Sequence, residues 1–311
     1  MVVVKLVARR LIAAVLLLLV LSLLTYALLA LSPGGPERAL LGDRPATPET
    51  IAAIRAQFLL DEPFPVRYWH WLSQALTGDF GTSITVRQPV ISMLSERVNV
   101  TVTLALLAAV VTLAVGIPAG LAAGIRRGGR LDRSITLVSL VFLSFPPFAI
   151  ALVLLYGFAI QLRWFPVYGT GDLSHYVLPA IALALGPAAV LTRHTRAAAL
   201  QVGEQDYITF ARARGLSRFG IWESYLLRNS ALPVLTIAGL IIAGYLTGAV
   251  FVEQAFSLPG LGSLLVQSVT QKDIPVVQAL VLLSGVVVIV ANLLVDVAYV
   301  IVNPQIRQGR A

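Results

Sequence analysis

Six long stretches without a single charged residue constrain this chain more than any other feature of its sequence. They cover residues 11–36, 98–125, 134–162, 173–192, 229–252 and 274–295. Each has at least 20 residues, and an α-helix of about 20 residues crosses the ~30 Å hydrocarbon core of a bilayer. Backbone amides find no water in that core, so helices are the expected conformation. The pattern predicts an all-α polytopic membrane protein with six transmembrane helices.

The composition excludes several other classes of chain. Hydrophobic residues make up 58% of the 311 residues and charged residues only 12%, whereas soluble domains carry roughly 25% charged residues. A soluble fold of this size cannot bury so much apolar surface, so the excess belongs in lipid. The chain also has no cysteine, which excludes disulfides, thiol nucleophiles and thiolate metal sites.

Two uncharged segments require a decision between a span and another structure. Residues 11–36 follow basic residues, as in a signal peptide, but Leu11–Leu31 is longer than the roughly 7–15 apolar residues of such a peptide. We expect a retained helix there. Residues 254–271 are also uncharged, yet they contain Gln254, Pro259, Gly260, Gly262 and Gln267. This polar and helix-breaking content favours a re-entrant or surface loop.

The positions of Lys and Arg predict the orientation of the chain. Basic residues exceed acidic ones in residues 1–10, 126–133, 193–228 and 303–311, which six spans place on one side of the membrane. The positive-inside rule makes this side cytoplasmic, so both termini are predicted to lie inside. The net charge of +8 is then a topology signal. We expect contact with membrane lipid and none with nucleic acid.

The predicted external segment, residues 32–97, carries signals of helices. Thr47-Pro48-Glu49 has the order of an N-cap, a first-turn proline and a first-turn acid. Farther along, Tyr68, Trp69 and Trp71 suit a helix at the membrane interface, where aromatic rings concentrate. Two roles of this helical segment stay open: packing over the spans, or receiving a partner.

The segment between the fourth and fifth spans is longer than a linker needs to be. Within it, residues 203–230 (the elbow segment) hold acids at Glu204 and Asp206, a glycine at Gly215 and a capping residue at Ser217. Acids favour the first turn of a helix and glycine its end, so we expect two short helices joined at Gly215. Connections usually take only a few residues, so this segment is predicted to engage a cytoplasmic partner. A basic helix lying on anionic lipid is the alternative.

The residues of this segment resemble those of a known family. The run Asp206-Tyr207-Ile208-Thr209-Phe210-Ala211-Arg212-Ala213-Arg214-Gly215-Leu216-Ser217, followed by Leu232-Pro233, is similar to the coupling segment of bacterial ABC-importer permeases. The match is to the dipeptide/oligopeptide/nickel (DppB/OppB-like) permease family. Further motifs agree in order along nearly the whole chain, at residues 78–83, 256–262, 273–278 and 303–307.

The resemblance implies both a fold and a site. It implies the ABC type I importer permease fold in the bacterial cytoplasmic (inner) membrane. The first span and external segment then occupy residues 1–97, the transmembrane domain residues 98–302 and a tail residues 303–311. The residues implied to couple to an ATPase are Asp206, Ala211, Arg212, Ala213, Arg214 and Gly215. One departure is Thr209-Phe210-Ala211, where importer permeases in general carry Glu-Ala-Ala.

The resemblance also implies partners: a second homologous permease subunit, two ATP-binding subunits and an extracytoplasmic solute-binding protein. The chain has no phosphate-binding P-loop of its own, because neither lysine, Lys5 or Lys272, follows a glycine-rich turn. ATP and Mg²⁺ are therefore expected on the partner subunits, with no cofactor and no enzymatic activity on this chain. A peptide is the expected substrate, while relatives that share these motifs carry nickel chelates, haem or sugars.

Other functions find less support in the sequence. An ion-gradient-driven carrier usually holds charges at mid-membrane, but the six stretches contain none and Asp296 falls at the predicted cytoplasmic edge. An intramembrane protease needs a base beside its serine, and none accompanies the serines of the spans. His70, His175 and His194 are scattered and predict no metal cluster. A membrane scaffold, which would transport nothing, is a further alternative.

Two sets of residues suggest how the spans pack and where a path opens. Glycines at every fourth position, Gly116, Gly120 and Gly124 and again Gly244 and Gly248, predict close helix packing. By the resemblance, substrate crosses between two permeases. The residues expected near the external mouth of that path are Gln254, Gln267, Pro259, Gly260 and Gly262.

Overall fold

The computed structural model describes residues 2–30, 37, 40–41, 47–221, 225 and 228–302, and the chain is all-helical where it is described. It divides into two compact units. Unit 1 comprises residues 1–101 and 259–289, and unit 2 comprises residues 102–258 and 290–311. The expectation of an all-α fold is confirmed for the described residues.

Each unit is built from helices that are distant in the sequence. Unit 1 holds α1 (Val2–Ala30), α3 (Pro48–Gln57), α4 (Phe64–Leu76), the start of α5 (Val90–Ile125), α12 (Leu261–Thr270) and the start of α13 (Ile274–Val302). Unit 2 holds the rest of α5 and of α13, α6 (Arg130–Ser144), α7 (Pro147–Leu154), the π-helix η1 (Leu155–Gln161), α8 (Ser174–Gly203), α9 (Asp206–Ala213), α10 (Arg218–Ile221) and α11 (Arg228–Ala255).

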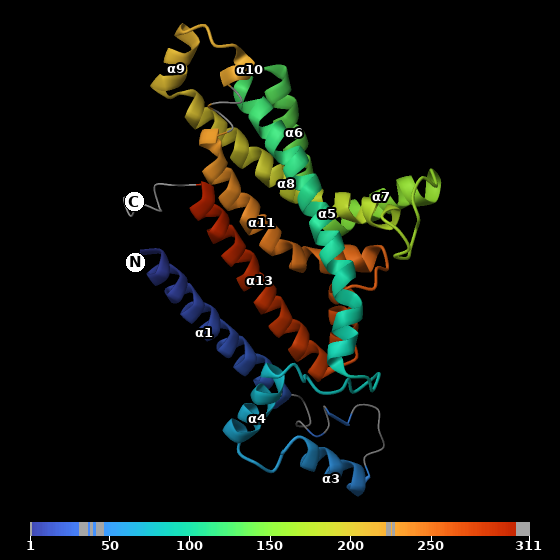
Figure 1. Cartoon of the computed structure of the whole chain (residues 1–311). Coiled ribbons are helices and arrows are strands. Elements are labelled where there is room, and N and C mark those ends of the chain that lie inside the picture. The colour runs from blue at the N-terminus through green and yellow to red at the C-terminus, as the bar shows by residue number, and fades with distance from the viewer. Residues whose placement is uncertain are drawn as a thin grey trace. The chain divides into compact units, whose positions relative to one another are not determined.

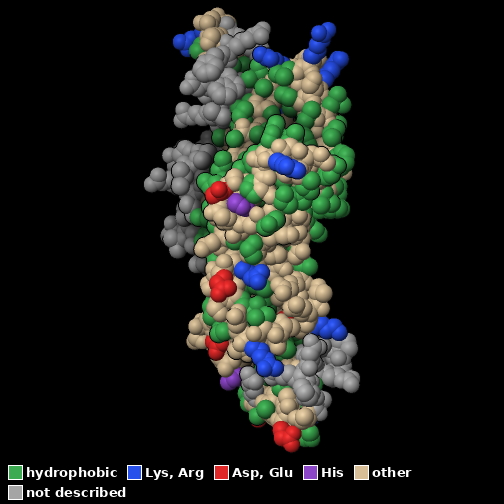
Figure 2. Space-filling view, turned by 90° about the vertical axis from the view of Figure 1, so that its right-hand side faces the viewer, with side chains coloured by type: hydrophobic (Ala, Val, Ile, Leu, Met, Phe, Trp, Pro, Cys, Tyr) green, Lys and Arg blue, Asp and Glu red, His purple; other side chains and the backbone are tan. Residues whose placement is uncertain are grey.

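Four of the described helices are long and apolar enough to cross a membrane: α5, α8, α11 and α13. A fifth span results if the bent pair of α6 with α7 and η1 is counted as one. The apolar part of α1, Ile12–Ala27, is shorter than these. Its outward side chains are exposed, Leu24 at 59% for example. Figure 2, which views the molecule from the side of α7, shows a broad area of hydrophobic side chains with few charged groups among them. Six spans and the orientation of the chain stay predictions.

The helix predicted for residues 134–162 is broken, which corrects the expectation of one continuous span. α6 and the α7–η1 pair meet at an angle of 102°, and α7 turns away from α6 in Figure 1. The cause is Pro146-Pro147. Phe145 takes an extended conformation (φ −96°, ψ 132°) because a following proline disfavours helical backbone, and two adjacent prolines remove two helical N–H donors.

One local prediction is confirmed, and a second is confirmed in part, because residues 261–270 form a helix where a loop was expected. Thr47 is the N-cap of α3, and its hydroxyl oxygen accepts a hydrogen bond from the Thr50 amide at 3.2 Å, with Pro48 and Glu49 in the first turn. The uncharged residues 254–271 form no span. They contain α12, whose 10 residues reach about 15 Å at 1.5 Å per residue, half the thickness of a bilayer core.

The glycines of α5 allow α8 to approach closely. A Cβ atom on Gly120 would lie 2.5 Å from the Thr192 carbonyl oxygen and 2.5 Å from the Thr195 Cβ. A Cβ atom on Gly124 would likewise lie 2.7 Å from the Ala199 Cβ. The prediction of helix packing is therefore confirmed for α5. In α11, a Cβ atom on Gly248 would lie 3.0 Å from the Leu183 side chain of α8, whereas none of the described residues lies within 4 Å of a Cβ on Gly244. Packing of Gly244 against another subunit stays a prediction.

A buried carboxylate joins two motifs of unit 1 that lie about 190 residues apart in the sequence. Asp273, only 1% exposed, accepts hydrogen bonds from the Ser83 hydroxyl and from the Thr85 hydroxyl at 2.7 Å. It also accepts bonds from the backbone amides of Ile84 at 3.2 Å and Thr85 at 3.3 Å. These contacts tie the loop before α5 to the start of α13. We call residues 78–89 the clasp loop.

Candidate functional site: the elbow segment

The elbow segment has the predicted local structure. α9 begins at Asp206, an acid in its first turn, and ends at Ala213. Gly215 then takes φ +79°, a left-handed conformation that glycine adopts at low cost. Ser217 caps α10, accepting a hydrogen bond from the Gly220 amide at 3.1 Å. The structure describes four residues of α10, and residues 222–224, which follow it, lie outside the described residues.

The inner face of α9 is anchored to the body of unit 2. Ile208 and Ala211, 0% and 1% exposed, pack with Leu121 of α5, Ala199 of α8 and Ile221 of α10. Figure 1 shows α9 and α10 at the end of unit 2 where α6 begins. Because α5 and α8 both contribute residues to this cluster, the elbow segment is expected to move together with the ends of these two helices.

The outer face of the elbow segment exposes apolar side chains beside a cation. Tyr207, Phe210 and Leu216 are 41%, 64% and 37% exposed. The guanidinium carbon of Arg214 lies 6.0 Å from the centre of the Phe210 ring, within cation–π range. Aromatic residues and arginine are enriched at protein–protein interfaces relative to the rest of the protein surface. We call Tyr207, Phe210, Arg214 and Leu216 the outer face.

A ring stack closes the two arms of the elbow segment. The rings of Tyr207 and Tyr225 lie 6.0 Å apart at an angle of 24°. Tyr225 also packs against the apolar cluster around Ile208. An aromatic pair of this kind contributes about 0.5–1.5 kcal/mol beyond its buried area. The turn at Gly215 is therefore held from both sides.

An ion pair supports the neighbouring end of unit 2. Asp132, 3% exposed, accepts two hydrogen bonds from the Arg196 guanidinium at 2.5 and 2.8 Å and one from the Gly128 amide at 2.9 Å. Asp132 precedes the uncharged part of α6, which starts at Ser134, so it lies outside the predicted span. The Arg196 hydrogen bond lowers the pKa of Asp132 to about 2, against the opposing effect of burial.

The predicted coupling residues do not all lie on the surface. Asp206, Ala213, Arg214 and Gly215 are exposed, whereas Ala211 lies in the packed inner face. The side chain of Arg212 is outside the described part of the chain. A coupling role for these six residues stays a prediction. The exposed Tyr207, Phe210 and Leu216 were not singled out, although Tyr207 and Phe210 stand three residues apart and so share a side of the helix.

The residues predicted to line a path are divided between the units. Gln254 belongs to unit 2, whereas Pro259, Gly260, Gly262 and Gln267 belong to unit 1. Gln254, Pro259 and Gln267 are exposed, and the two glycines are buried. Their role in a path stays a prediction.

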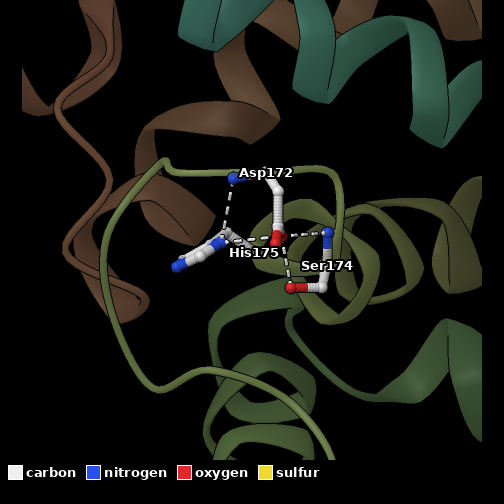
Figure 3. A network of polar contacts seen from close by, with 3 residues as sticks. All are labelled: Asp172, Ser174 and His175. Carbon is white, nitrogen blue, oxygen red and sulfur yellow. Dashed lines mark hydrogen bonds and ion pairs between the residues drawn. The ribbon is translucent and has the colours of Figure 1, made fainter.

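No group of three or more potential metal-binding side chains is found among the described residues. His175 instead contacts Asp172 at the start of α8, with its Nδ1 3.1 Å from the Asp172 carboxylate (Figure 3). The same carboxylate accepts hydrogen bonds from the Ser174 hydroxyl and from the Ser174 amide at 2.8 Å. The Ser174 and His175 hydrogen bonds lower the pKa of Asp172. This arrangement fits a capping role for His175.

Comparison with known proteins places the chain in a family. Residues 116–308 match the family described as binding-protein-dependent transport system inner membrane component, and residues 3–105 match the N-terminal part of such components. A probable peptide ABC transporter permease of Sinorhizobium fredii is 36% identical over 97% of this chain and 98% of its own length. The glutathione transport system permease of Escherichia coli K12 is 37% identical over the same shares.

A solved structure supports the fold. A chain of the MetNI methionine ABC transporter in an inward-facing conformation superposes with a TM-score of 0.59 at 18% identity, over 68% of this chain and 96% of that chain. The likeness shows the fold of a type I importer permease. Together with the apolar helices and the sequence matches, it establishes that this chain is a bacterial inner-membrane protein of the binding-protein-dependent ABC transporter permease family, in its DppB/OppB-like group.

Proposed function

We propose that this chain translocates peptides or a related small solute, as one membrane subunit of an ATP-driven importer, and that its elbow segment receives the ATPase. The observation that carries the proposal is the two-sided build of α9. The inner face of α9 packs into unit 2, and the outer face of the elbow segment presents Phe210, Leu216 and Arg214 to a partner. The names of the relatives support a peptide-type substrate.

The two faces suit the transmission of force. A coupling element must be rigid relative to the helices that it moves and must bind the ATPase through its other side. Ile208 and Ala211 provide the rigid side. On the other side, Phe210 offers an aromatic anchor and Arg214 a charge beside it, a pairing frequent at binding hot spots. Gly215 permits the turn that directs Leu216 out of the helix.

The proposed assembly follows the family. It contains a second homologous permease, two ATP-binding subunits and an extracytoplasmic solute-binding protein, with six spans in each permease and both termini inside. Hydrolysis of ATP belongs to the partners in this scheme. A nickel- or haem-type solute remains an alternative substrate within the same family, and identifying what the co-purified binding protein carries distinguishes these.

Placing a negative charge on the outer face tests the docking role. In the reconstituted complex, Phe210→Glu or Arg214→Glu should lower substrate-stimulated ATP hydrolysis at least about tenfold, because hot-spot losses cost about 2 kcal/mol or more. Gln201→Glu, an exposed change at the end of α8, is the control and should leave stimulation intact. Unchanged stimulation in the two outer-face variants would remove the docking assignment. Transport that persists without the ATPase and collapses with an uncoupler would favour an ion-driven carrier.

Labelling tests the orientation. The chain has no cysteine of its own, so Arg55→Cys and Gly129→Cys each introduce a single reporter. A membrane-impermeant thiol reagent applied to intact spheroplasts should label position 55 and should reach position 129 only after lysis. Labelling of both positions from one side would refute the proposed topology.

A further inference from the structure

Unit 1 contains a cavity that none of the functions above uses. It has a volume of about 340 Å³, within the range of about 300–1,000 Å³ that is typical of small-molecule sites. Its walls come from α1, from α4, from the clasp loop and from the start of α13. The lining residues are Tyr26, Leu40, Phe58, Arg67, His70, Trp71, Gln74, Asp79, Phe80, Gly81, Thr82, Pro89, Ile274, Pro275 and Gln278.

The lining combines aromatic walls with a few polar groups, as ligand sites do. Tyr26 and Trp71 lie with their ring centres 5.3 Å apart and form part of an aromatic cluster of α1 and α4. Phe58 and Phe80 add two further rings. Gln278, 4% exposed, donates through its amide nitrogen to the Thr25 carbonyl oxygen at 3.3 Å. Flat apolar surfaces therefore enclose a small number of polar atoms.

Arg67 is the cation of this lining, and its bonding is incomplete. Its Nε is buried and has no hydrogen-bond partner among the described residues. Asp79, the acid of the lining, accepts a hydrogen bond from the Gly81 amide at 2.8 Å but none from the Arg67 Nε. A buried guanidinium donor without an acceptor costs free energy, and a carboxylate is the acceptor that matches its planar fork.

We propose that this cavity binds a small molecule that carries a carboxylate next to an apolar or aromatic group. The carboxylate accepts hydrogen bonds from Arg67, and the apolar body lies against Trp71, Phe58 and Phe80. Gln74 and His70 are lining residues of α4 that are also exposed to solvent. The proposal rests on unit 1 alone and does not require the elbow segment to bind an ATPase.

A matched pair of probes tests the proposal on the purified full-length chain in lipid nanodiscs. N-acetyl-L-phenylalanine carries the carboxylate, and N-acetyl-L-phenylalaninamide has the same body without the charge. Calorimetric titration should show saturable binding of the acid at least about tenfold tighter than that of the amide, because hydrogen bonds to charged groups are the stronger ones. Equal affinity for the two probes, or saturable binding of neither, would overturn the proposal.

Three variants locate the binding. Arg67→Gln should weaken binding of the acid about ten- to hundredfold and leave the amide unchanged. Gln74→Trp, which adds a bulky ring to the lining from an exposed helix position, should weaken binding of both probes, and it stays informative if Arg67→Gln fails to fold. Arg87→Gln, an exposed arginine of the same unit outside the lining, is the control and should bind as the original chain does. Full affinity in both lining variants would contradict the assignment. Tighter competition by inorganic phosphate than by acetate would show a phosphate or lipid-headgroup site instead.

Discussion

The clasp loop of unit 1 and the elbow segment of unit 2 both join helices, yet they are stabilised in different ways. The clasp loop depends on one buried carboxylate, Asp273, that gathers hydroxyl and amide donors of residues 83–85. The elbow segment depends on apolar packing of Ile208 and Ala211 and on a glycine turn. The first is therefore sensitive to the loss of one charge and the second to changes in shape.

This difference has a physical reason. A buried carboxylate is stable only while its hydrogen bonds are made, so its contacts are lost together. Apolar packing distributes its free energy over many small contacts, and a single change removes only some of them. A buried, hydrogen-bonded carboxylate is sufficient to hold a loop in place. An element that transmits movement benefits from apolar packing, because a packed element keeps its shape under load.

The largest expected effect is at Asp273. Asp273→Ala leaves the Ser83 and Thr85 hydroxyls and two amides without their acceptor, and should destabilise the clasp loop by about 3 kcal/mol. Opening of the loop then rises about 100-fold. Limited trypsin digestion after the exposed Arg87, which lies in this loop, measures the change. Asp61→Ala removes a carboxylate that is 76% exposed and should not alter the cleavage rate. Equal rates in both variants would show that Asp273 does not hold the loop.

The next largest effect tests whether unit 2 also contains a buried carboxylate, Asp132, that stabilises its surroundings as Asp273 does in unit 1. Arg196→Gln leaves Asp132 buried with only the Gly128 amide and the Thr136 side chain as hydrogen-bond donors. The change should cost about 2 kcal/mol, less than for a fully buried pair, because the Arg196 side chain is 31% exposed. The thermal midpoint of unfolding in detergent reports the loss. The control is Arg127→Gln, whose ion pair with Glu204 is exposed on both sides and contributes little.

The pH dependence of that pair has a definite sign. The folded pKa of Asp132, about 2, lies below its ordinary value of 3.8, so the pair stabilises the fold fully above pH 4. Its contribution falls as pH decreases from about 4 to 2. The original chain should therefore lose more stability over this interval than Arg196→Gln does. Parallel curves for the two proteins would contradict the assignment.

A smaller effect is expected from adding one methyl group between α5 and α8. Gly120→Ala places a Cβ 2.5 Å from the Thr192 carbonyl oxygen, so the helices must separate, at a cost of about 1–3 kcal/mol. Gly244→Ala is the matched control, since a Cβ there meets nothing within 4 Å, and it should be neutral or slightly stabilising. Thermal unfolding of the two variants should differ. Similar midpoints would show that the helices can yield at little cost.

Sequence reasoning succeeded where the cause is local and failed where it is distant. Gaps between charges located α8 and α11, and Thr47 and Gly215 could be recognised because a cap and a left-handed turn depend on their own residues. The hydrogen bond between Asp273 and Ser83 could not be predicted, since no short-range signal links residues about 190 positions apart. The prediction of one continuous span over residues 134–162 missed the break at Pro146, because a proline shows where a helix is weakened whereas tertiary packing decides the angle.

The candidate site shows the same limit. The motif identified the elbow segment, and acids with a glycine predicted its two helices. Which side of α9 is buried depends on Leu121 and Ala199, which belong to other helices. Sequence reasoning alone could therefore not separate the buried Ala211 from the exposed Phe210.

The smallest expected effect concerns the turn itself. Gly215 has φ +79° and nothing within 4 Å of a Cβ placed on it, so Gly215→Ala adds backbone strain without any collision. The strain should cost about 1–2 kcal/mol, and Gly215→Asn should cost less, because asparagine tolerates this conformation better. Gly203→Ala is the control: its surroundings are equally open, its φ is not positive, and alanine favours a helix. The stimulation of ATP hydrolysis in the assembled complex should be highest for Gly203→Ala, lower for Gly215→Asn and lowest for Gly215→Ala. If Gly215→Ala and Gly203→Ala behaved alike, the turn would not set the shape of the elbow segment, and its resistance to single changes would come from packing alone.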